Sequence, residues 1–246
     1  MSSKEEFDNK IGRLTKSKAY LEFCEQVYGY RLYLFNMMDK EQLDFVFNSI
    51  PMTSQDSILD LGCGSGSILS YLIDKYKCSG VGIDQLENEY FAGKRNESLR
   101  YVQGDIDSIP NYNLNPTVAV SIDSLYFSSS LEAILRDLCS FPNCRKYLFY
   151  SQYLFDEKPT DRSALLADNM MVARILKMNV VSYETVDFSY NEKRLYERSL
   201  TILQGMKQDF CNEGNADLFE SKLEESMIGK KLYDDNQASR FLYTVK

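Results

Sequence analysis

Apolar residues alternate along this 246-residue chain between short continuous runs and longer segments with helical spacing. A short, mainly apolar run is typical of a strand that is buried on both faces of a parallel sheet. Segments with helical spacing separate the runs, as in Ser67–Lys77, where the residues expected to turn inward are Ile68, Leu69, Tyr71 and Leu72. The alternation predicts an α/β fold. The expected strands are 58–61, 80–84, 99–103, 117–122 and 146–152.

The two ends of the chain have a different pattern. Residues 4–50 are predicted to be helical and rich in tyrosine, with two helices in Ala19–Asn36 that are interrupted at Gly29. An amphipathic helix is expected over Lys40–Ile50, stopped by Pro51. Beyond the fifth strand we expect one more helix, a sixth strand, two charged amphipathic helices and a last strand. Their expected bounds are Asp161–Lys177, Val180–Phe188, Glu192–Gln208, Asp217–Met227 and Arg240–Val245.

A glycine-rich turn follows the first expected strand, where Ile58–Gly66 reads Ile-Leu-Asp-Leu-Gly-Cys-Gly-Ser-Gly. Glycines let the backbone bend sharply and come close to a ligand. Dinucleotide-binding turns have the spacing G-x-G-x-x-G, whereas here Gly62, Gly64 and Gly66 alternate. A carboxylate near the turn, on Asp60, repels phosphate and favours a cation. The turn therefore predicts a positively charged ligand.

An acidic residue, Asp84, ends the second expected strand, Gly80–Asp84, 18 residues beyond Gly66. This offset is close to the roughly 20 residues at which a dinucleotide fold places its ribose-binding acid. A carboxylate can accept hydrogen bonds from both hydroxyls of a ribose. The alternative is that Asp84 caps a helix over Gln85–Lys94. The spacing favours the ligand role.

These segments resemble class I S-adenosylmethionine-dependent methyltransferases. Asp60 to Gly66 matches their motif I, D-x-G-x-G-x-G, and Asp84 matches the ribose-binding acid of motif II. Asp105 and Ile106, after the third strand Leu99–Gln103, match the adenine-binding pair. The resemblance is specific over about Ser57–Phe127. It implies S-adenosylmethionine as cofactor, S-adenosylhomocysteine as product, and these binding residues: Asp60, Gly62, Gly64, Gly66, Asp84, Gln85, Asp105, Ile106 and Ser121.

The fourth strand, Thr117–Ile122, is followed by Asp123-Ser124-Leu125-Tyr126-Phe127. In the family, motif IV lies at this place and contacts both the methionine part of the cofactor and the acceptor. Asp123 and Tyr126 are the candidate catalytic residues, because either could orient the nucleophile or accept its proton. In the alternative, Tyr126 and Phe127 only wall the pocket, and Asp123 caps a helix over Ser128–Leu138. At Asp105, the competing interpretation is that Asp107 caps a turn before Pro110.

The resemblance also implies a lid. Small-molecule methyltransferases commonly fold an N-terminal helical segment over the cofactor, and several carry a helical cap before the last strand. We expect a single domain with a Rossmann-like, doubly wound, mostly parallel seven-stranded sheet. Tyr20, Tyr28 and Tyr30 are candidate acceptor-binding residues that could hold an amine by cation–π attraction; core packing is the alternative. Within this domain we expect four parts: an N-terminal helical lid segment over 1–50, a cofactor-binding core over 51–189, a helical cap insertion over 190–236 and the last strand over 237–246.

The composition and charge of the chain indicate which classes of partner, such as nucleic acid, membrane or metal ions, are favoured or disfavoured. The net charge of −8 and a pI near 4.8 disfavour nucleic acid, although a local basic patch stays open. No apolar run is long enough to span a bilayer, and the N-terminus lacks a signal-peptide pattern, so we expect a cytoplasmic protein. Six scattered cysteines and no histidine predict reduced thiols and no metal site, and exclude an imidazole base.

The sequence thus predicts a methyltransferase that acts on a small molecule by direct displacement. Two alternatives stay open. The first is a methyltransferase for a peptide or protein, which would need an open, charged groove. The second is a non-catalytic module that binds S-adenosylmethionine. A dinucleotide oxidoreductase is disfavoured by the glycine spacing and by Asp60. The acceptor and the oligomeric state are not specified by any pattern in the chain.

Overall fold

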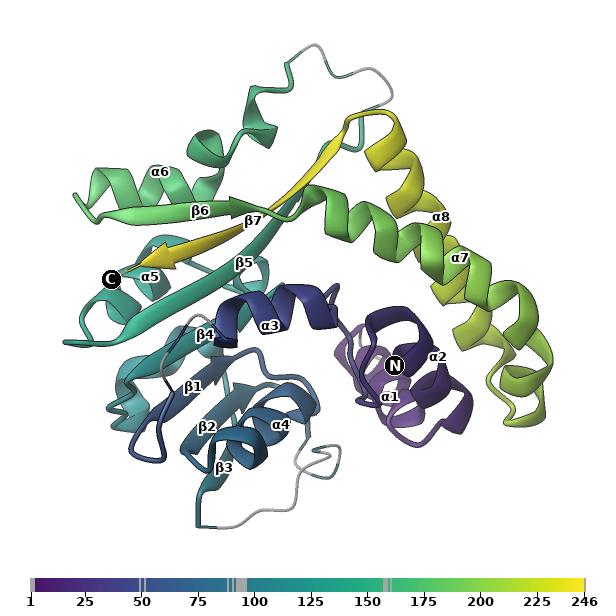
Figure 1. Ribbon diagram of the computed structural model, residues 1–246, viewed down its shortest axis with the longest axis horizontal. Helices are drawn as coiled ribbons and strands as arrows, with labels where there is room; N and C mark the ends of the chain where they lie inside the picture. The colour runs from purple at the N-terminus through teal and green to yellow at the C-terminus, as the bar shows by residue number, and fades with distance from the viewer. Residues whose placement is uncertain are drawn as a thin grey trace.

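Seven strands form one sheet in the order β3-β2-β1-β4-β5-β7-β6 (Figure 1). The computed structural model describes residues 3–48, 50, 52–87, 89, 91, 97–156, 159 and 161–245. Strands β1 to β5 are parallel, and β7 runs antiparallel between β5 and β6. The predicted α/β class and seven-stranded sheet are confirmed. The bounds are β1 Ser57–Leu61, β2 Ser79–Asp84, β3 Leu99–Gln103, β4 Val118–Ile122, β5 Arg145–Tyr153, β6 Tyr183–Asp187 and β7 Ala238–Val245.

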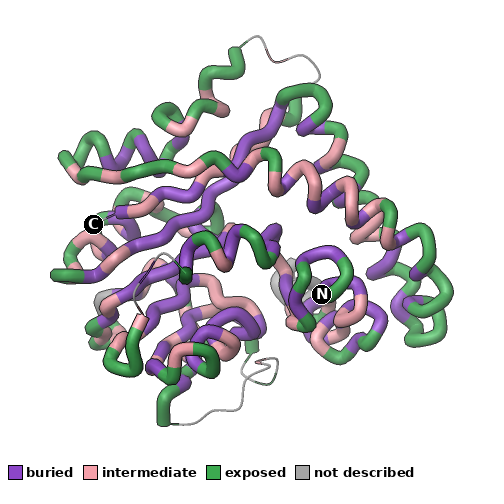
Figure 2. The backbone as a smooth tube through the Cα atoms, in the orientation of Figure 1, coloured by how far each residue is buried: buried purple, intermediate pink, exposed green. Residues whose placement is uncertain are grey.

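Helices cover both faces of the sheet, and each face has its own apolar core (Figure 2). Neighbouring residues of β1 point to opposite faces, so Ile58 joins one core and Leu59 joins the other. The first core is closed by α2 (Lys18–Tyr28), α3 (Lys40–Asn48), α4 (Ser67–Tyr76) and α7 (Ser189–Asn212). The second is closed by α5 (Leu131–Cys139) and α6 (Met171–Met178). This double cover explains the continuous apolar strands.

The expected second helix of Ala19–Asn36 does not form, which corrects the sequence prediction. Helix α2 ends at Gly29, whose φ of +82° closes it in the left-handed region. The segment from 30 to 39 is irregular because its backbone bonds to side chains instead of to a helical ladder. Leu34 O accepts the Tyr20 hydroxyl, and Met37 O accepts Gln42 Nε2 at 2.9 Å. Helix α3 ends at Asn48, and Pro51 lies outside the described residues.

Two other expected elements are shorter than predicted. Helix α6 begins at Met171 rather than Asp161, because the Asp161 carboxylate accepts the backbone N–H of Ser163 and starts a tight turn instead. Strand β6 begins at Tyr183; Val180, the predicted start, is exposed with a φ of +56°. The helix expected over Gln85–Lys94 lies largely outside the described residues, and Gln85 and Leu86 form a bend.

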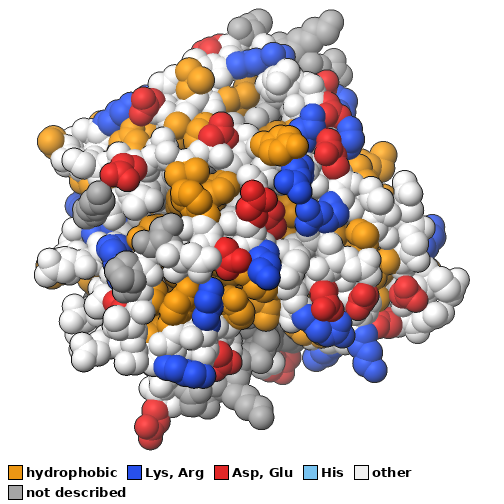
Figure 3. Space-filling view, in the orientation of Figure 1, with side chains coloured by type: hydrophobic (Ala, Val, Ile, Leu, Met, Phe, Trp, Pro, Cys, Tyr) orange, Lys and Arg blue, Asp and Glu red, His pale blue; other side chains and the backbone are white. Residues whose placement is uncertain are grey.

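A long helical hairpin separates β6 from β7. Its arms are α7 and α8 (Ala216–Asp234), and it packs against α2 on the right of Figure 1. Side chains of both charges are interspersed along α7 in Figure 3, and some pair between the arms, as Lys193 does with Asp234 at 2.8 Å. Among the described helices, none is long and apolar enough to cross a membrane.

The tip of this hairpin holds the N-terminal helices α1 (Ser3–Leu14) and α2. The Glu213 carboxylate accepts the backbone N–H groups of Lys18 and Ala19 at 3.0 and 3.1 Å. The Arg13 guanidinium binds Asp217 at 2.6 Å. The N-terminal segment and the late insertion, far apart in the chain, are thus joined on one side of the sheet.

Candidate functional site

The glycine turn lies between β1 and α4, at the carboxyl end of the sheet. Gly62, Gly64 and Gly66 have φ angles of +70°, +55° and +71°. A residue with a side chain is strained in this left-handed region of the backbone. Space is limiting too, since a Cβ on Gly62 would lie 2.2 Å from Ser124 Cβ. The backbone N–H groups of Gly62 and Cys63 both donate to Ile83 O, which fixes the turn against β2. The turn therefore needs glycine for its conformation and its close packing.

Asp84, at the end of β2, lies against this turn. Its Oδ2 accepts Gly64 N–H at 2.7 Å and its Oδ1 accepts Leu86 N–H at 2.9 Å. Burial raises the pKa of the Asp84 carboxyl, and the two backbone N–H groups act against that rise. Asp84 thus shapes the turn in addition to facing the cavity beside it.

Asp60 is a buried carboxylate with no hydrogen bond to any residue in the described part of the chain. Burial, with a smaller contribution from Asp84, raises the pKa of Asp60 to about 7. A buried charge is costly unless it is paired. The surroundings of Asp60 therefore favour a ligand with a positively charged group that pairs with its carboxylate.

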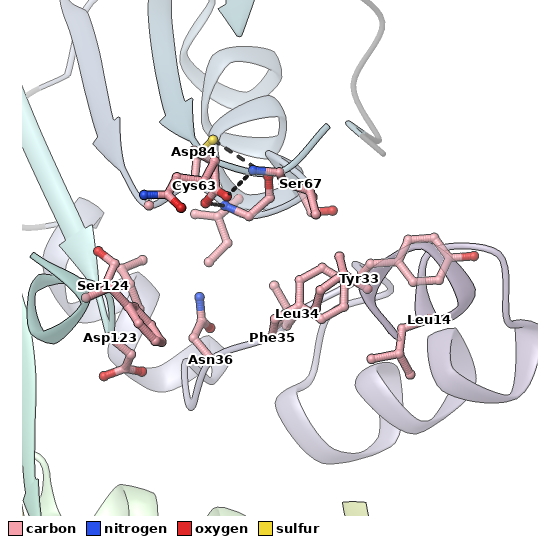
Figure 4. A pocket seen from close by; sticks show the side chains of 18 of the residues that line it. Leu14, Tyr33, Leu34, Phe35, Asn36, Cys63, Ser67, Asp84, Asp123 and Ser124 are labelled. Carbon is pink, nitrogen blue, oxygen red and sulfur yellow. Dashed lines mark hydrogen bonds between the residues drawn. The ribbon is translucent and has the colours of Figure 1, made fainter. Parts of the chain in front are cut away.

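These residues line a cavity of about 530 Å³. Figure 4 shows its two sides: Asp84, Cys63 and Ser67 face Asn36 and Leu34 across the gap. Helix α8 contributes Lys222 and Glu225, whose ion pair measures 2.8 Å. The volume falls in the range of about 300–1,000 Å³ found for small-molecule pockets. Further lining comes from α1, from Tyr20, Tyr33 and Phe35, from Ile68 of α4, from the segments after β2 and β3, and from the end of β4 with its following loop.

Most of the predicted site residues meet at this cavity. Those lining it are Asp60, Gly62, Gly64, Asp84, Gln85, Ile106, Asp123, Tyr126 and Tyr20. Gly66, Asp105, Ser121, Tyr28 and Tyr30 are not among its lining residues. The Gly66 turn instead packs on Tyr101, whose hydroxyl donates to Gly66 O at 3.2 Å. Ser121 is buried with its Oγ 2.6 Å from Ser124 Oγ.

Asp105 follows β3 and is exposed. Its Oδ1 accepts Asp107 N–H at 2.9 Å, so Asp105, rather than Asp107, caps the short helix Ile106–Tyr112. The Asp107 carboxylate accepts Ser129 N–H at 2.7 Å instead. Ile106 is buried and reaches the cavity. The adenine-binding role of Asp105 stays a prediction.

The three candidate tyrosines do not form a common cage. Tyr20 is fully buried, and its hydroxyl donates to Leu34 O. Tyr28 packs edge-on against Phe23 in the core. Tyr30 donates to Asp44 at 3.2 Å, and its ring lies 5.0 Å from that of Tyr71. Of the three, only Tyr20 lines the cavity, because Tyr28 and Tyr30 are turned toward other partners.

Asp123 has a φ of +54°, and its carboxylate is bound on both oxygens. Oδ1 accepts Arg240 Nη1 at 2.5 Å, and Oδ2 accepts Met37 N–H at 3.1 Å. Arg240 is fully buried and also binds Gln42 Oε1 at 2.9 Å. A carboxylate held in this way has both oxygens engaged and a fixed orientation. Sequence reasoning missed Arg240, although a lone arginine in an apolar last strand was a signal for a buried ion pair.

A second buried acid, Glu192 of α7, extends this network. Its carboxylate accepts the hydroxyls of Tyr153, at 2.7 Å, and of Tyr233, and lies 3.6 Å from Arg240 Nη1. Burial raises the pKa of Glu192, whereas Arg240 acts to lower it. No sequence pattern could have joined these residues, because they come from β5, α7, α8 and β7. The network ties the hairpin to the end of β4.

Metal ligands do not gather in the described residues: no group of three or more His, Cys, Asp or Glu side chains is placed to hold an ion. All six cysteines are free thiols; Cys24, Cys78 and Cys144 are buried, and Cys211 is exposed. The only cysteine at the cavity is Cys63, within the part of the chain that the structure describes.

Comparisons with known proteins support the fold. A family model described as methionine biosynthesis protein MetW matches residues 40–136, less than half of the chain. No curated protein matches the sequence. The cyclopropane synthase MmaA2 of Mycobacterium tuberculosis aligns over 97% of both chains with a TM-score of 0.71 and 13% identity.

Two further solved structures contain S-adenosylhomocysteine. Phosphoethanolamine N-methyltransferase 2 of Haemonchus contortus, bound also to phosphomonomethylethanolamine, has a TM-score of 0.73 at 11% identity over 92% of this chain and 56% of that one. A methyltransferase of Geobacter sulfurreducens has a TM-score of 0.60 at 15% identity over 92% of this chain and 97% of that one. These likenesses show that the chain has the fold of class I S-adenosylmethionine-dependent methyltransferases.

Proposed function

We propose that this chain is an S-adenosylmethionine-dependent methyltransferase that methylates a small molecule. One observation carries the proposal: a single cavity joins the glycine turn and its two acids to a wall of N-terminal and hairpin helices. In open α/β sheets, ligands bind at the carboxyl ends of the strands, where this cavity lies. Solved structures of the same fold hold S-adenosylhomocysteine.

The residues at the turn fit this cofactor. Asp60 is a buried carboxylate without a partner among the described residues, which suits the ammonium group of the methionine moiety. Asp84 suits the ribose hydroxyls, and Ile106 suits the face of the adenine. Gly62 and Gly64 line the cavity with no side chain of their own between the backbone and a ligand. When bound, the cofactor supplies an activated methyl group on a positively charged sulfur.

The covering helices favour a small acceptor over a macromolecule. Ile11 and Leu14 of α1 and Lys222 of α8 line the cavity together with the residues of the turn. They are held there by the Arg13–Asp217 ion pair and by Glu213 at the start of α2. A closed site excludes water and aligns the reacting atoms, and alignment is the main contribution a protein makes to an already activated donor. A peptide would need a more open groove.

The proposal is tested by ligand binding and by transfer of label. A ligand at 100 times its dissociation constant stabilises a folded protein by about 2.7 kcal/mol. We expect S-adenosylhomocysteine to raise Tm and NAD to leave it unchanged. Incubation with methyl-labelled S-adenosylmethionine and a cell extract, separated by size, should place the label in the small-molecule fraction. Label in protein would favour a peptide acceptor, and binding without transfer would favour a regulatory module.

A further inference from the structure

The carboxylate of Asp60 lines the cavity without a counterion from the described part of the chain. The residue is only 5% exposed, and burial together with the charge of Asp84 raises its pKa. Two unpaired polar side-chain atoms of the described residues are closed to solvent, Asn36 Oδ1 and Arg240 Nη2, and the oxygens of Asp60 are not among them. A ligand in the cavity can therefore reach this carboxylate.

Asp123 shows what Asp60 lacks. It lines the same cavity on the loop after β4, but its Oδ1 is paired with the buried guanidinium of Arg240. A buried carboxylate that has no cation is more stable as the neutral acid. Because the pKa of Asp60 is about 7, roughly half of the free molecules carry a proton on Asp60 at pH 7.

The titratable groups nearest to Asp60 add negative charge or none. Asp84 ends the neighbouring strand β2, and the charge of Asp8, on α1, acts on Asp84 in turn. Burial raises the pKa of the Cys63 thiol and of the Tyr101 hydroxyl, so both stay neutral in the range where Asp60 titrates. A proton on Asp60 therefore limits the negative charge at the turn while the cavity holds no cationic ligand.

The lysines that line the cavity are engaged by other partners. Lys10 Nζ, on α1, donates to Ser221 Oγ at 2.8 Å. Lys222 Nζ, on α8, pairs with Glu225 at 2.8 Å. Neither lysine acts on the pKa of Asp60. The positive charge that stabilises an ionised Asp60 must then come from the ligand.

We propose, on the basis of the proposed function, that the ammonium group of the cofactor displaces a proton from Asp60 when the cofactor binds. The carboxyl O–H bond breaks, the proton passes to water, and the carboxylate pairs with the ammonium group, which keeps its own protons. A positive charge within about 4–6 Å favours the ionised form of a carboxylate. The site thereby recognises the amino-acid part of its ligand through a change of protonation, and its affinity depends on pH.

Below pH 7 the free protein holds the proton that binding must expel. Each pH unit below 7 should therefore weaken binding by up to about 10-fold, whereas above pH 7 Asp60 is already ionised and the affinity levels off. From about pH 7.5 to about pH 5.5, we expect the dissociation constant of S-adenosylhomocysteine to rise by roughly 10- to 25-fold. Near pH 6, roughly 0.9 proton should leave for each molecule bound.

Titration calorimetry of the full-length protein across this pH range tests the inference. S-adenosylhomocysteine is compared with methylthioadenosine, which keeps the adenosine and the thioether sulfur but has no ammonium group. Near pH 6 each titration is repeated in MES and in imidazole, whose ionisation enthalpies differ, so that the difference in heat counts the protons released. We expect release with S-adenosylhomocysteine and almost none with methylthioadenosine, although both place a ribose against Asp84.

Two variants assign the proton to its residue. Asp60→Asn keeps the shape of the side chain and removes the titrating group. It should bind S-adenosylhomocysteine more weakly than the wild type above pH 7, with an affinity that no longer depends on pH and with no proton released. The control Asp74→Asn, on the exposed face of α4, should behave as the wild type.

Three results would overturn the inference and leave the proposed function intact. They are an S-adenosylhomocysteine affinity that is constant across the pH range, equal proton release by the two ligands, and proton release retained in Asp60→Asn. The comparison of ligands uses the wild type, so it decides the question even where Asp60→Asn does not fold. A folded wild-type protein that binds neither ligand at any pH would defeat the proposed function, and the inference with it.

Discussion

Arg240 Nη1 lies 2.5 Å from Asp123 Oδ1, and both side chains are almost completely buried. The two residues are 117 positions apart in sequence, yet they connect the last strand to the loop that follows β4. Gln42 and Ser151 also bind the same guanidinium. One partner of this ion pair, Asp123, lines the cavity, so the cavity wall depends on the pair.

Breaking this pair should destabilise the fold. Arg240→Met leaves Asp123 and Glu192 buried without their cation, and losses of about 3–5 kcal/mol are typical for one broken buried pair. Denaturant unfolding measures the free energy of unfolding. Arg136→Met, at an exposed position of α5, should stay within about 0.5 kcal/mol of the wild type. An Arg240→Met protein as stable as the control would show that the network contributes no stability.

The glycine turn makes a prediction with a control in the same chain. In Gly66→Ala, the new Cβ would lie 2.1 Å from Tyr101 Cε1 on a backbone with a φ of +71°, so we expect a loss of at least about 2 kcal/mol and weaker S-adenosylhomocysteine binding. Gly205→Ala, in α7 with no atom near its Cβ, should instead stabilise the protein by about 0.5–1 kcal/mol. Equal effects at the two positions would contradict the assigned turn geometry.

The joint between the N-terminal helices and the hairpin should be measurable through Glu213. Its carboxylate accepts two backbone N–H groups of α2 and the Ser17 hydroxyl, so Glu213→Ala should lower the free energy of unfolding by about 1–2 kcal/mol. S-adenosylhomocysteine should also dissociate faster, because α1 and α2 cover the cavity. The exposed Glu220, paired with Lys207, gives the control Glu220→Ala, expected near zero. If S-adenosylhomocysteine dissociates from Glu213→Ala at the wild-type rate, the contacts between Glu213 and α2 do not affect ligand binding in the cavity.

Asp60 predicts a specific pH dependence. Its folded pKa of about 7 exceeds the unfolded value near 3.9, so the folded state binds more protons between these limits. Stability of the free protein should therefore fall as pH rises from 4 to 7, by at most about 1.4 kcal/mol per pH unit from this group. Asp60→Asn should remove that part of the slope, and Asp74→Asn, on the exposed face of α4, should retain it. Parallel profiles for wild type and Asp60→Asn would contradict the assignment.

The sequence predicted the parts of the fold and site that depend on local patterns. Continuous apolar runs located the strands, and the glycine spacing located the turn that carries Asp60 and faces Asp84. The irregular segment after Gly29 was predicted to be helical, because its bonds to Tyr20, Gln42 and Asp123 depend on contacts distant in sequence. For the same reason, the bonding of Asp123 by Arg240 could not be found from spacing alone.

The central claim is that the cavity beside the glycine turn binds an adenosylated, cationic methyl donor, and titration calorimetry with S-adenosylhomocysteine tests it most directly. We expect one molecule bound per chain, at least about 30-fold weaker binding in Asp84→Ala because both the ribose contact and the Gly64 N–H bond are lost, and unchanged binding in Asp74→Ala. No heat from a folded wild-type protein, or equal affinity in Asp84→Ala, would contradict the claim.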